Sequence, residues 1–201
     1  MIYHEFKELK LSSLGFGTMR LPLIPGGGEQ DIDQETLDRM VESAIAGGVN
    51  YFDTAYPYHG GCSELAIGKS LARYPRESFY LADKFPGHQI VKGVKKLDPE
   101  TVFEEQLKKC GVEYFDFYLL HNINEHSMSY YGNPENKYLD YFLEQKANGR
   151  IKHLGFSCHS AAEGLEQFLQ MCGDKMEFCQ IQLNYLDWTL QNAKKKCEIL
   201  K

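Results

Sequence analysis

The sequence lacks several features that would place it quickly in a class. Its 201 residues contain no run of 18 or more apolar residues, and the first ten, MIYHEFKELK, include no apolar signal-peptide segment. The formal net charge is −6, so no basic excess points to nucleic acid or to an anionic membrane. We therefore expect a cytoplasmic protein that binds neither nucleic acid nor membrane.

Clustered metal ligands are also missing. The six cysteines are scattered at positions 62, 110, 158, 172, 179 and 197, and no two of them form a C-x-x-C pair. Zinc and iron–sulfur sites need closely spaced ligands. The pattern therefore predicts reduced, mostly buried cysteines and no metal site.

A Rossmann phosphate-binding loop is a third absence. Such a loop needs G-x-G-x-x-G between a strand and a helix. Gly15-Phe16-Gly17 is followed by Thr-Met-Arg, so the third glycine is missing, and Gly26–Gly28 is a bare run of glycines. Neither stretch supports a Rossmann fold.

What the chain does contain is a regular alternation of apolar runs with stretches of helical spacing. Six short apolar runs occur, at 13–17, 49–53, 79–84, 115–121, 151–157 and 178–183, and four of them end in a charged or polar residue. Between them the spacing predicts helices that include 33–48, 98–111, 133–149 and 160–173, with Asp98, Asn133 and Ser160 at three of the starts. Residues 3–12 are expected to form a hairpin at one end of the sheet. The alternation predicts an α/β fold with parallel strands, either doubly wound or closed into a barrel.

Polar side chains at the ends of these strands suggest a catalytic site. Asp53, Lys84, His121 and Ser157 close four successive strands, and Tyr58 follows Asp53 by five residues. In a (β/α)₈ barrel, the carboxyl ends of the strands meet on the face that holds the active site. A phenol ionises near pH 10, at about three units above neutrality, so it needs help to exchange its proton. A buried lysine would favour the phenolate, an aspartate would hold the lysine charged, and a neutral histidine would donate to a substrate oxygen.

Each of these residues also has a commoner structural interpretation. A strand-end aspartate usually caps a turn, a strand-end histidine is often a satisfied core residue, and a lone tyrosine is usually packing. The occurrence of Asp53, Tyr58, Lys84 and His121 on three successive strands favours chemistry instead. Together they would polarise a carbonyl and donate a proton to it, as hydride addition to an aldehyde or ketone requires.

FDTAYPYHGGCSE, ADK, YLLH and LGFSCHS occur in this order, and over residues 13–188 the chain resembles the aldo-keto reductase family. The family pattern D-T-A-x-x-Y matches Asp53 through Tyr58. The resemblance implies a (β/α)₈ TIM barrel, a small-molecule carbonyl substrate, and NADPH or NADH as cofactor. It also implies Tyr58 as the general acid, Lys84 paired with Asp53, and His121 as the residue that orients the carbonyl.

The same resemblance implies a set of cofactor contacts. They map to Gly17, Thr18, Met19, Asp53, Ser157 and Gln180. Asp53 would lie near the ribose, and Ser157 and Gln180 near the carboxamide. Many members have Asn after that serine, whereas this chain has Cys158. Residues 85–92 and 122–133 are expected to line the substrate pocket.

The length of the chain leaves other interpretations open. A complete barrel takes about 250 residues, and six strand–helix units are visible here. YPYHGG and QIQLNYLDW are similar to bacterial members with a C-terminal ferredoxin-like 4Fe-4S domain, which has no counterpart in this sequence. We therefore expect residues 1–201 to be one partial-barrel domain of a C-terminally truncated chain. The alternatives are an inactive fragment, a non-catalytic cofactor-sensing barrel, or a lyase with Lys84 as a Schiff base.

Overall fold

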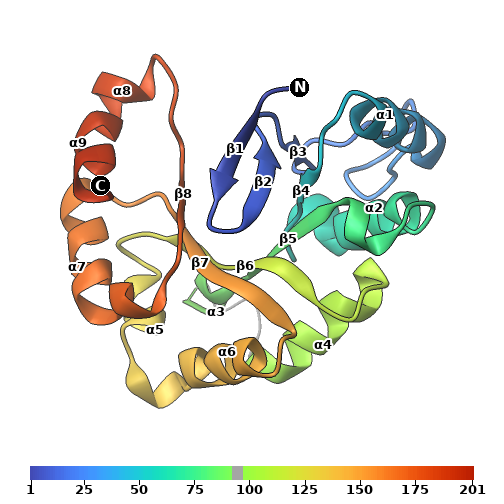
Figure 1. Ribbon diagram of the computed structural model, residues 1–201. Helices are drawn as coiled ribbons and strands as arrows, with labels where there is room; N and C mark the ends of the chain where they lie inside the picture. The colour runs from blue at the N-terminus through green and yellow to red at the C-terminus, as the bar shows by residue number, and fades with distance from the viewer. Residues whose placement is uncertain (92–96) are drawn as a thin grey trace. The chain divides into compact units, whose positions relative to one another are not determined.

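Strands and helices alternate along the chain, which divides into two units. The computed structural model describes residues 1–91 and 97–201 (Figure 1). The first unit comprises residues 1–84 and 103–117, and the second comprises residues 85–102 and 118–201. Six strands follow one another in the order β3-β4-β5-β6-β7-β8, and β1 and β2 form a separate antiparallel pair. The predicted α/β class is therefore confirmed.

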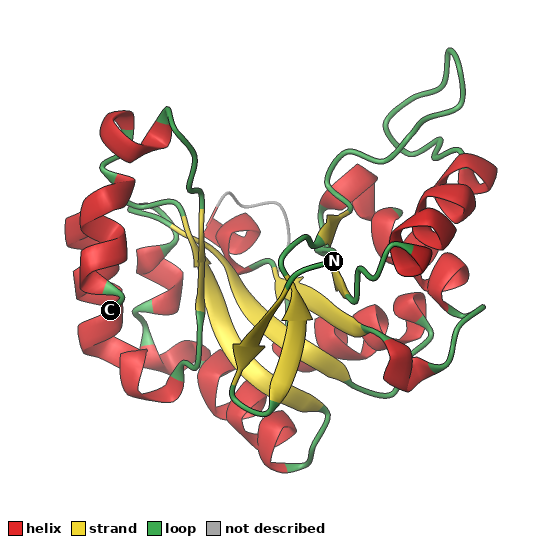
Figure 2. Cartoon of the chain, turned by 45° about the horizontal axis from the view of Figure 1, so that its top comes forward, coloured by secondary structure: helices red, strands yellow, loops and turns green. Residues whose placement is uncertain are grey.

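The first unit contains the first half of the sheet and the helices that follow its strands (Figure 2). Its elements are β1 (Tyr3–Phe6), β2 (Leu9–Ser12), β3 (Phe16–Gly17), α1 (Gln34–Ala46), β4 (Tyr51–Asp53), the 3₁₀ helix η1 (Tyr58–Gly61), α2 (Ser63–Leu71), the 3₁₀ helix η2 (Arg76–Ser78), β5 (Tyr80–Phe85), most of α4 (Pro99–Cys110) and the start of β6 (Phe115–Ile123). Strands β3, β4 and β5 are parallel, with Gly17 opposite Asp53 and Asp53 opposite Ala82. Each predicted apolar run of this unit overlaps an observed strand.

The hairpin predicted over residues 3–12 is present as β1 and β2, which pair antiparallel. The ring of Phe6 lies 5.5 Å from that of Phe117. Phe117 also contacts Tyr51 at 5.2 Å and Tyr80 at 6.4 Å, and these two residues begin β4 and β5. Because the hairpin packs at the amino ends of these strands, their carboxyl ends stay available for a site.

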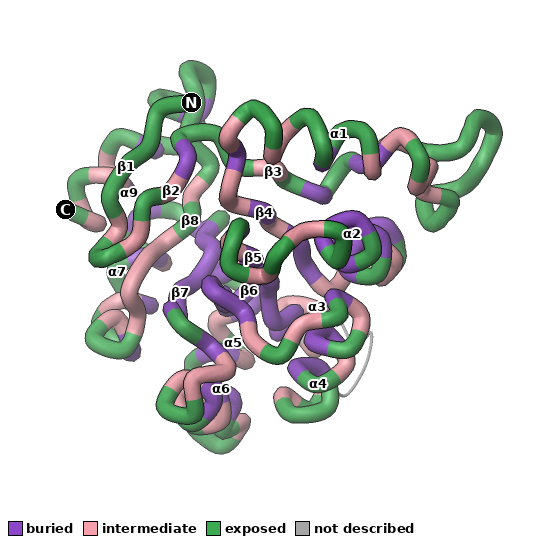
Figure 3. The backbone as a smooth tube through the Cα atoms, turned by 45° about the vertical axis from the view of Figure 1, so that its right-hand side comes forward, coloured by how far each residue is buried: buried purple, intermediate pink, exposed green. Residues whose placement is uncertain are grey.

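The core of the first unit lies between its strands and its helices, and Figure 3 shows the buried backbone positions in purple. Phe52 and Phe79 meet edge to face at 6.1 Å, and Phe103 and Phe115 do so at 5.9 Å. Helix α2 approaches the end of α4 so closely that a Cβ on Gly68 would lie 2.6 Å from the carbonyl oxygen of Cys110. This contact leaves room for glycine alone.

We expect Gly68→Ala to lower the free energy of unfolding by about 1–3 kcal/mol, because overpacking forces backbone shifts of that cost. The obstructing atom is a main-chain oxygen, which cannot move aside as a side chain can. Urea denaturation measures the loss. Gly28→Ala is the matched control, since its Cβ would make ordinary contact at 3.6 Å with Asp31. Equal stability of the two variants would contradict the prediction.

The second unit continues the alternation of strands and helices. Its elements are α3 (Gly87–Val91), the rest of β6, α5 (Met128–Tyr131), the 3₁₀ helix η3 (Pro134–Asn136), α6 (Tyr138–Ala147), β7 (Ile151–Cys158), α7 (Ala162–Cys172), the 3₁₀ helix η4 (Gly173–Lys175), β8 (Cys179–Ile181), α8 (Asp187–Leu190) and α9 (Ala193–Ile199). Strands β7 and β8 are parallel, with Ser157 opposite Gln180. No helix within the described ranges is long and apolar enough to span a bilayer.

The single helix predicted over 133–149 is wrong at its start. Asn133 does cap a helix, accepting the N–H of Glu135 at 3.0 Å, but that helix is the short η3. Lys137 then takes a left-handed conformation with φ of 50°, and α6 begins only at Tyr138. The reason is tertiary packing: the buried hydroxyl of Tyr138 donates to the carbonyl oxygen of Tyr131, which fixes where α6 starts.

The helix expected to begin on Ser160 differs less. Helix α7 begins at Ala162, and Ala161 occupies the position before it. The Ser160 hydroxyl lies 3.1 Å from the Cys158 Sγ and does not cap the helix. By contrast, Asp98 caps α4 as predicted, accepting the N–H of Thr101 at 2.9 Å.

Candidate active site

The carboxyl end of β4 is held by a buried set of hydroxyl groups. The N–H and the hydroxyl of Thr18 both donate to the carbonyl oxygen of Asp53, at 2.9 and 3.0 Å. The Ser63 hydroxyl at the start of α2 lies 2.7 Å from that of Thr18 and 3.0 Å from that of Thr54. These bonds connect the ends of β3 and β4 to the start of α2, next to the main chain of Asp53.

The loop that carries Tyr58 owes its shape to the three residues that follow. His59, Gly60 and Gly61 all have positive φ, at 53°, 59° and 91°. The His59 Nε2 accepts the N–H of Leu21 at 2.9 Å, so the ring proton is on Nδ1, which donates to the Glu29 carbonyl oxygen at 2.9 Å. This imidazole is therefore a structural link between the Tyr58 loop and the main chain at Leu21 and Glu29.

Lys84 lies at the end of β5 and is only 1% exposed. Its Nζ forms an ion pair with the carboxylate of Asp53 and donates to the Thr54 carbonyl oxygen at 2.7 Å. The same Nζ lies 5.0 Å from the centre of the Tyr58 ring. The first unit thus brings together three of the four residues predicted to be catalytic.

The charge on Lys84 is maintained by these neighbours. Burial by itself lowers the pKa of Lys84, but the charge of Asp53, the electrostatic interaction with the Tyr58 side chain and the hydrogen bond to Asp53 outweigh it, and the pKa is raised. The amine is therefore an ammonium ion at neutral pH. A cation in a dry site acts strongly on a nearby phenol, because little water screens it.

His121, the fourth predicted residue, belongs to β6 in the second unit and is 8% exposed. Its ring meets that of His88 edge-on at 4.8 Å. The Tyr131 hydroxyl is shared between two carbonyl oxygens, at 3.0 Å from that of His121 and 3.1 Å from that of Phe85. Tyr131 therefore sets the positions of the ends of β5 and β6 within this unit, a role that the sequence did not reveal.

The predicted cofactor contacts occupy different environments. Gly17 and Met19 are exposed, and a Cβ on Gly17 would meet no atom within 4 Å, so there is room for a ligand at the end of β3. Thr18 is fully buried, and its hydroxyl is used inside the protein as described above. In the second unit, the Ser157 hydroxyl accepts the N–H of Asn122 at 2.8 Å, and its own hydrogen can still be donated. Gln180 is exposed on β8.

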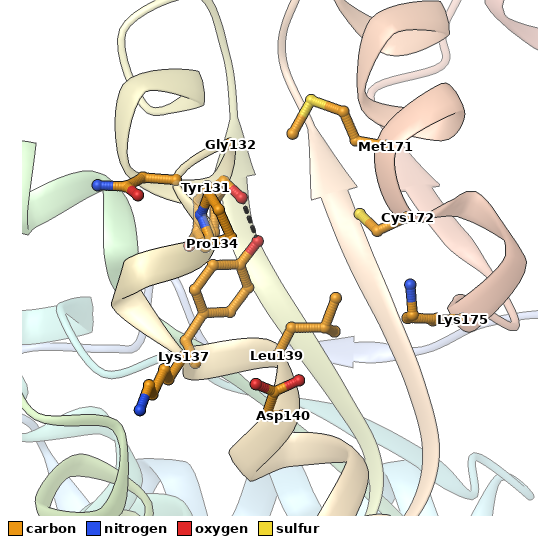
Figure 4. A pocket seen from close by; sticks show the side chains of 11 residues that line it. Tyr131, Gly132, Pro134, Lys137, Leu139, Asp140, Met171, Cys172 and Lys175 are labelled. Atoms are coloured by element: carbon orange, nitrogen blue, oxygen red, sulfur yellow. Dashed lines mark hydrogen bonds between the residues drawn. The ribbon is translucent and has the colours of Figure 1, made fainter.

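The segments expected to line the substrate pocket lie in the second unit. Of residues 85–92, Lys92 is outside the described residues. Within 122–133, the Asn124 side chain accepts the N–H groups of His126 and Ser127, at 2.9 and 3.0 Å. A pocket of about 390 Å³ lies beside this segment, between the start of α6 and the end of α7 (Figure 4). Tyr131, Gly132 and Asn133, which belong to this segment, help to line it, whereas none of the residues predicted to be catalytic or to contact the cofactor does.

Sequence analysis missed a set of buried polar residues behind Lys84. Glu64, Asp83 and Gln106 are all fully buried in the first unit. The signal was present, since Asp83 is an acid inside the apolar run FYLAD just before Lys84. Among residues 1–91 and 97–201, no group of three or more His, Cys, Asp or Glu could hold a metal ion.

Comparisons with known proteins identify the family of the chain. The sequence profile described as "Aldo/keto reductase family" matches residues 13–201. The NADH-specific methylglyoxal reductase of Escherichia coli is 27% identical over 202 residues, which cover 92% of this chain and 59% of that protein. A probable aldo-keto reductase of Glycine max is 29% identical and is covered over 42% of its length. The chain thus spans about half the length of these curated relatives.

Solved structures show the same fold. A thermostable aldo-keto reductase crystallised with the inhibitor epalrestat has a TM-score of 0.74 and 25% identity, and the match covers 100% of this chain and 70% of that one. The holo form of an aldo-keto reductase from Bacillus halodurans has a TM-score of 0.68 and 24% identity, over 91% of this chain and 58% of that one. The predicted barrel fold, with six of its strands in this chain, is confirmed.

Proposed function

Because this chain belongs to the aldo/keto reductase family, we propose that it is an oxidoreductase that uses NADPH or NADH to reduce an aldehyde or ketone to an alcohol. The observation that carries the proposal is the fully buried Lys84, ion-paired with Asp53 and lying 5.0 Å from the Tyr58 ring. An isolated buried ammonium is costly. Its position beside a phenol is the arrangement that proton donation by tyrosine requires.

When bound, the nicotinamide cofactor would supply the hydride that the carbonyl carbon accepts. Tyr58 gives its phenolic proton to the carbonyl oxygen, and the product is an alcohol. The Lys84 ammonium stabilises the phenolate that remains until a proton from solvent replaces the one donated. Asp53 holds that ammonium in place and keeps it charged, in agreement with the raised pKa of Lys84.

His121 would orient the substrate by donating a hydrogen bond to the carbonyl oxygen. Its main chain is fixed by the Tyr131 hydroxyl, which supports such a role, since an orienting group must be rigid. Residues 122–133 and the described part of 85–92 would line the substrate pocket.

The cofactor would lie along the carboxyl ends of the strands. Gly17 and Met19 would contact it at β3, Asp53 near the ribose, and Ser157 and Gln180 at the carboxamide. Thr18 is fully buried, so we assign it a role in holding the end of β4 and no direct contact with the cofactor. The Ser157 hydroxyl can donate to a carboxamide oxygen while it accepts from Asn122. Cys158 is 1% exposed with its Sγ beside Ser160, so we assign it no carboxamide contact.

The test is the oxidation of reduced cofactor by a small reactive aldehyde. Methylglyoxal is the first choice because a relative is named as a methylglyoxal reductase that is NADH-specific. We expect the absorbance of NADH or NADPH to fall only when the aldehyde is present. A folded chain that binds neither cofactor and shows no turnover with several aldehydes would refute the proposal. Cofactor binding without turnover would favour the non-catalytic alternative.

A further inference from the structure

Beside the main chain of Lys84 lies the buried cluster of Glu64, Asp83 and Gln106, whereas Tyr58 lies near the Nζ at the end of the side chain. These residues come from α2, β5 and α4, and each is 0% exposed. The proposed mechanism gives them no part. Burying a polar group costs free energy unless the group is hydrogen-bonded. The hydrogen bonds of these three residues therefore indicate what the cluster does.

The cluster holds both main-chain polar groups of Lys84. The Asp83 Oδ1 accepts the N–H of Lys84 at 2.8 Å. The Gln106 Nε2 donates to the carbonyl oxygen of Lys84 at 3.2 Å and also to the Glu64 Oε1 at 3.0 Å. The main-chain N–H and the carbonyl oxygen of Lys84 are therefore both held by side chains of the cluster.

The cluster and the charged residues next to it contain more carboxyl groups than basic groups. Glu64 Oε2 pairs with Lys109 at 3.1 Å, and Lys109 also pairs with Glu105 at 2.9 Å. The other Asp83 oxygen, Oδ2, lies 3.9 Å from the Sγ of the Cys110 thiol. Two ionised carboxylates cannot share a dry site at low cost, and a hydrogen bond between them needs a proton.

The pKa directions identify which acid keeps that proton. Burial raises the pKa of Asp83 well above its usual range, and the charge of Glu64 and a hydrogen bond with it raise it further. Burial also raises the pKa of Glu64, but Lys109 and the Gln106 amide oppose the rise. The Lys84 N–H and its ammonium lower the pKa of Asp83, but the net direction is upward. The contacts favour the same assignment, because Glu64 receives the Lys109 ammonium and the Gln106 amide, whereas Asp83 receives a main-chain N–H and a thiol. We therefore assign the proton to Asp83 and the charge to Glu64.

We propose that Asp83 and Glu64 share one buried proton at neutral pH, and that neutral Asp83 is a positioning residue for Lys84. It holds the Lys84 peptide without setting a second negative charge beside the ammonium. Asp53 is then the carboxylate that pairs with Lys84. The positive charge of Lys84 can act on the Tyr58 hydroxyl. The part of this inference that concerns catalysis rests on the proposed function, whereas the shared proton does not.

The ionisable groups around this pair come from several elements. They are Asp53 on β4, Tyr58 on η1, Glu64 on α2, Lys84 on β5, and Glu105, Lys109 and Cys110 on α4. Burial raises the pKa of the Cys110 thiol well above its usual range. The thiol is therefore neutral and does not compete for the proton.

Infrared spectroscopy of the whole chain in D₂O tests the shared proton without any turnover. Ordinary aspartic and glutamic acids ionise near pH 4, at about 3.9 and 4.3. We expect a carboxylic-acid C=O band that persists as the pH is raised to 7 and is absent from Asp83→Asn. Asp174→Asn, at a side chain that is 76% exposed, is the control and should keep the band. A wild-type spectrum at pH 7 without the band, or a band that survives in Asp83→Asn, overturns the proposal.

The positioning role is tested by rescue in the reductase assay. Asn at position 83 can still accept the Lys84 N–H and donate to Glu64, whereas Leu can do neither. We expect Asp83→Leu to lose on the order of 10²-fold in kcat through misplacement of Lys84, with KM little changed, and Asp83→Asn to recover it. If Asp83→Leu does not fold, Asp83→Asn decides, since a comparable loss of kcat there overturns the role. A chain that shows the infrared band but no turnover refutes the proposed function and leaves the shared proton standing.

Discussion

Tyr58→Phe should lower the kcat for aldehyde reduction by about 10²–10⁴-fold, which is the usual contribution of a positioned proton donor. The substitution removes only the hydroxyl, so the ring that lies 5.0 Å from the Lys84 Nζ remains in place. Cofactor binding and the free energy of unfolding should therefore change little. The rate is followed by the absorbance of the reduced cofactor, and binding by its fluorescence.

The matched control is Tyr56→Phe, two residues earlier in the same loop. The Tyr56 hydroxyl donates to Glu105 at 3.2 Å, and its ring lies 4.6 Å from the Lys109 Nζ, so it has a lysine neighbour but no buried Asp–Lys pair. We expect its kcat to stay near that of the unchanged chain. Comparable rates for Tyr58→Phe and Tyr56→Phe would rule out the assignment of the proton donor.

Lys84→Met should abolish turnover and lower the free energy of unfolding by about 3–5 kcal/mol, the cost of removing one partner of a buried ion pair. The change leaves the Asp53 carboxylate, whose side chain is 13% exposed, without its cation. Met preserves most of the packing of the lysine stem. Urea denaturation measures the stability, and the cofactor assay measures the rate.

A second substitution separates the charge effect from packing. Adding Asp53→Asn to Lys84→Met removes the stranded carboxylate, so most of the lost stability should return while the activity does not. Lys69→Met, at an exposed position on α2, is the control and should change the stability by no more than about 0.5 kcal/mol. If the double variant is less stable than Lys84→Met alone, the ion pair is not the source of the loss.

Much of this architecture could be predicted because its signals are local. A strand or a helix shows its period within about ten residues, so the six apolar runs and the start of α4 at Asp98 were found correctly. Asp53 and Tyr58 lie in one short motif, and Lys84 directly follows a strand, so their approach follows from the order of parallel strands. Their catalytic roles remain predictions.

The errors and omissions concern side-chain contacts that the periodicity of strands and helices does not reveal. Asn133 and Pro134 are a genuine helix start, but they open the short η3, because Tyr138 must reach Tyr131 and so delays α6. Thr18 was predicted to contact the cofactor, but its hydroxyl is hydrogen-bonded to the Asp53 carbonyl oxygen and to the Ser63 hydroxyl. The residues next to Asn133 and Thr18 in the sequence give no signal that predicts these interactions.

By itself, the sequence determined the order of strands and helices, the family, and the identity of the polar groups at the strand ends. Those properties depend on periodicity and on short motifs, which can be recognised in the sequence without knowing the tertiary contacts. The tertiary structure alone decided that the Lys84 ammonium is dry and paired with Asp53, and that Glu64 and Asp83 meet behind it. Burial and the distance between charges set the protonation of such groups, and both arise only when α2, β4, β5 and α4 pack together.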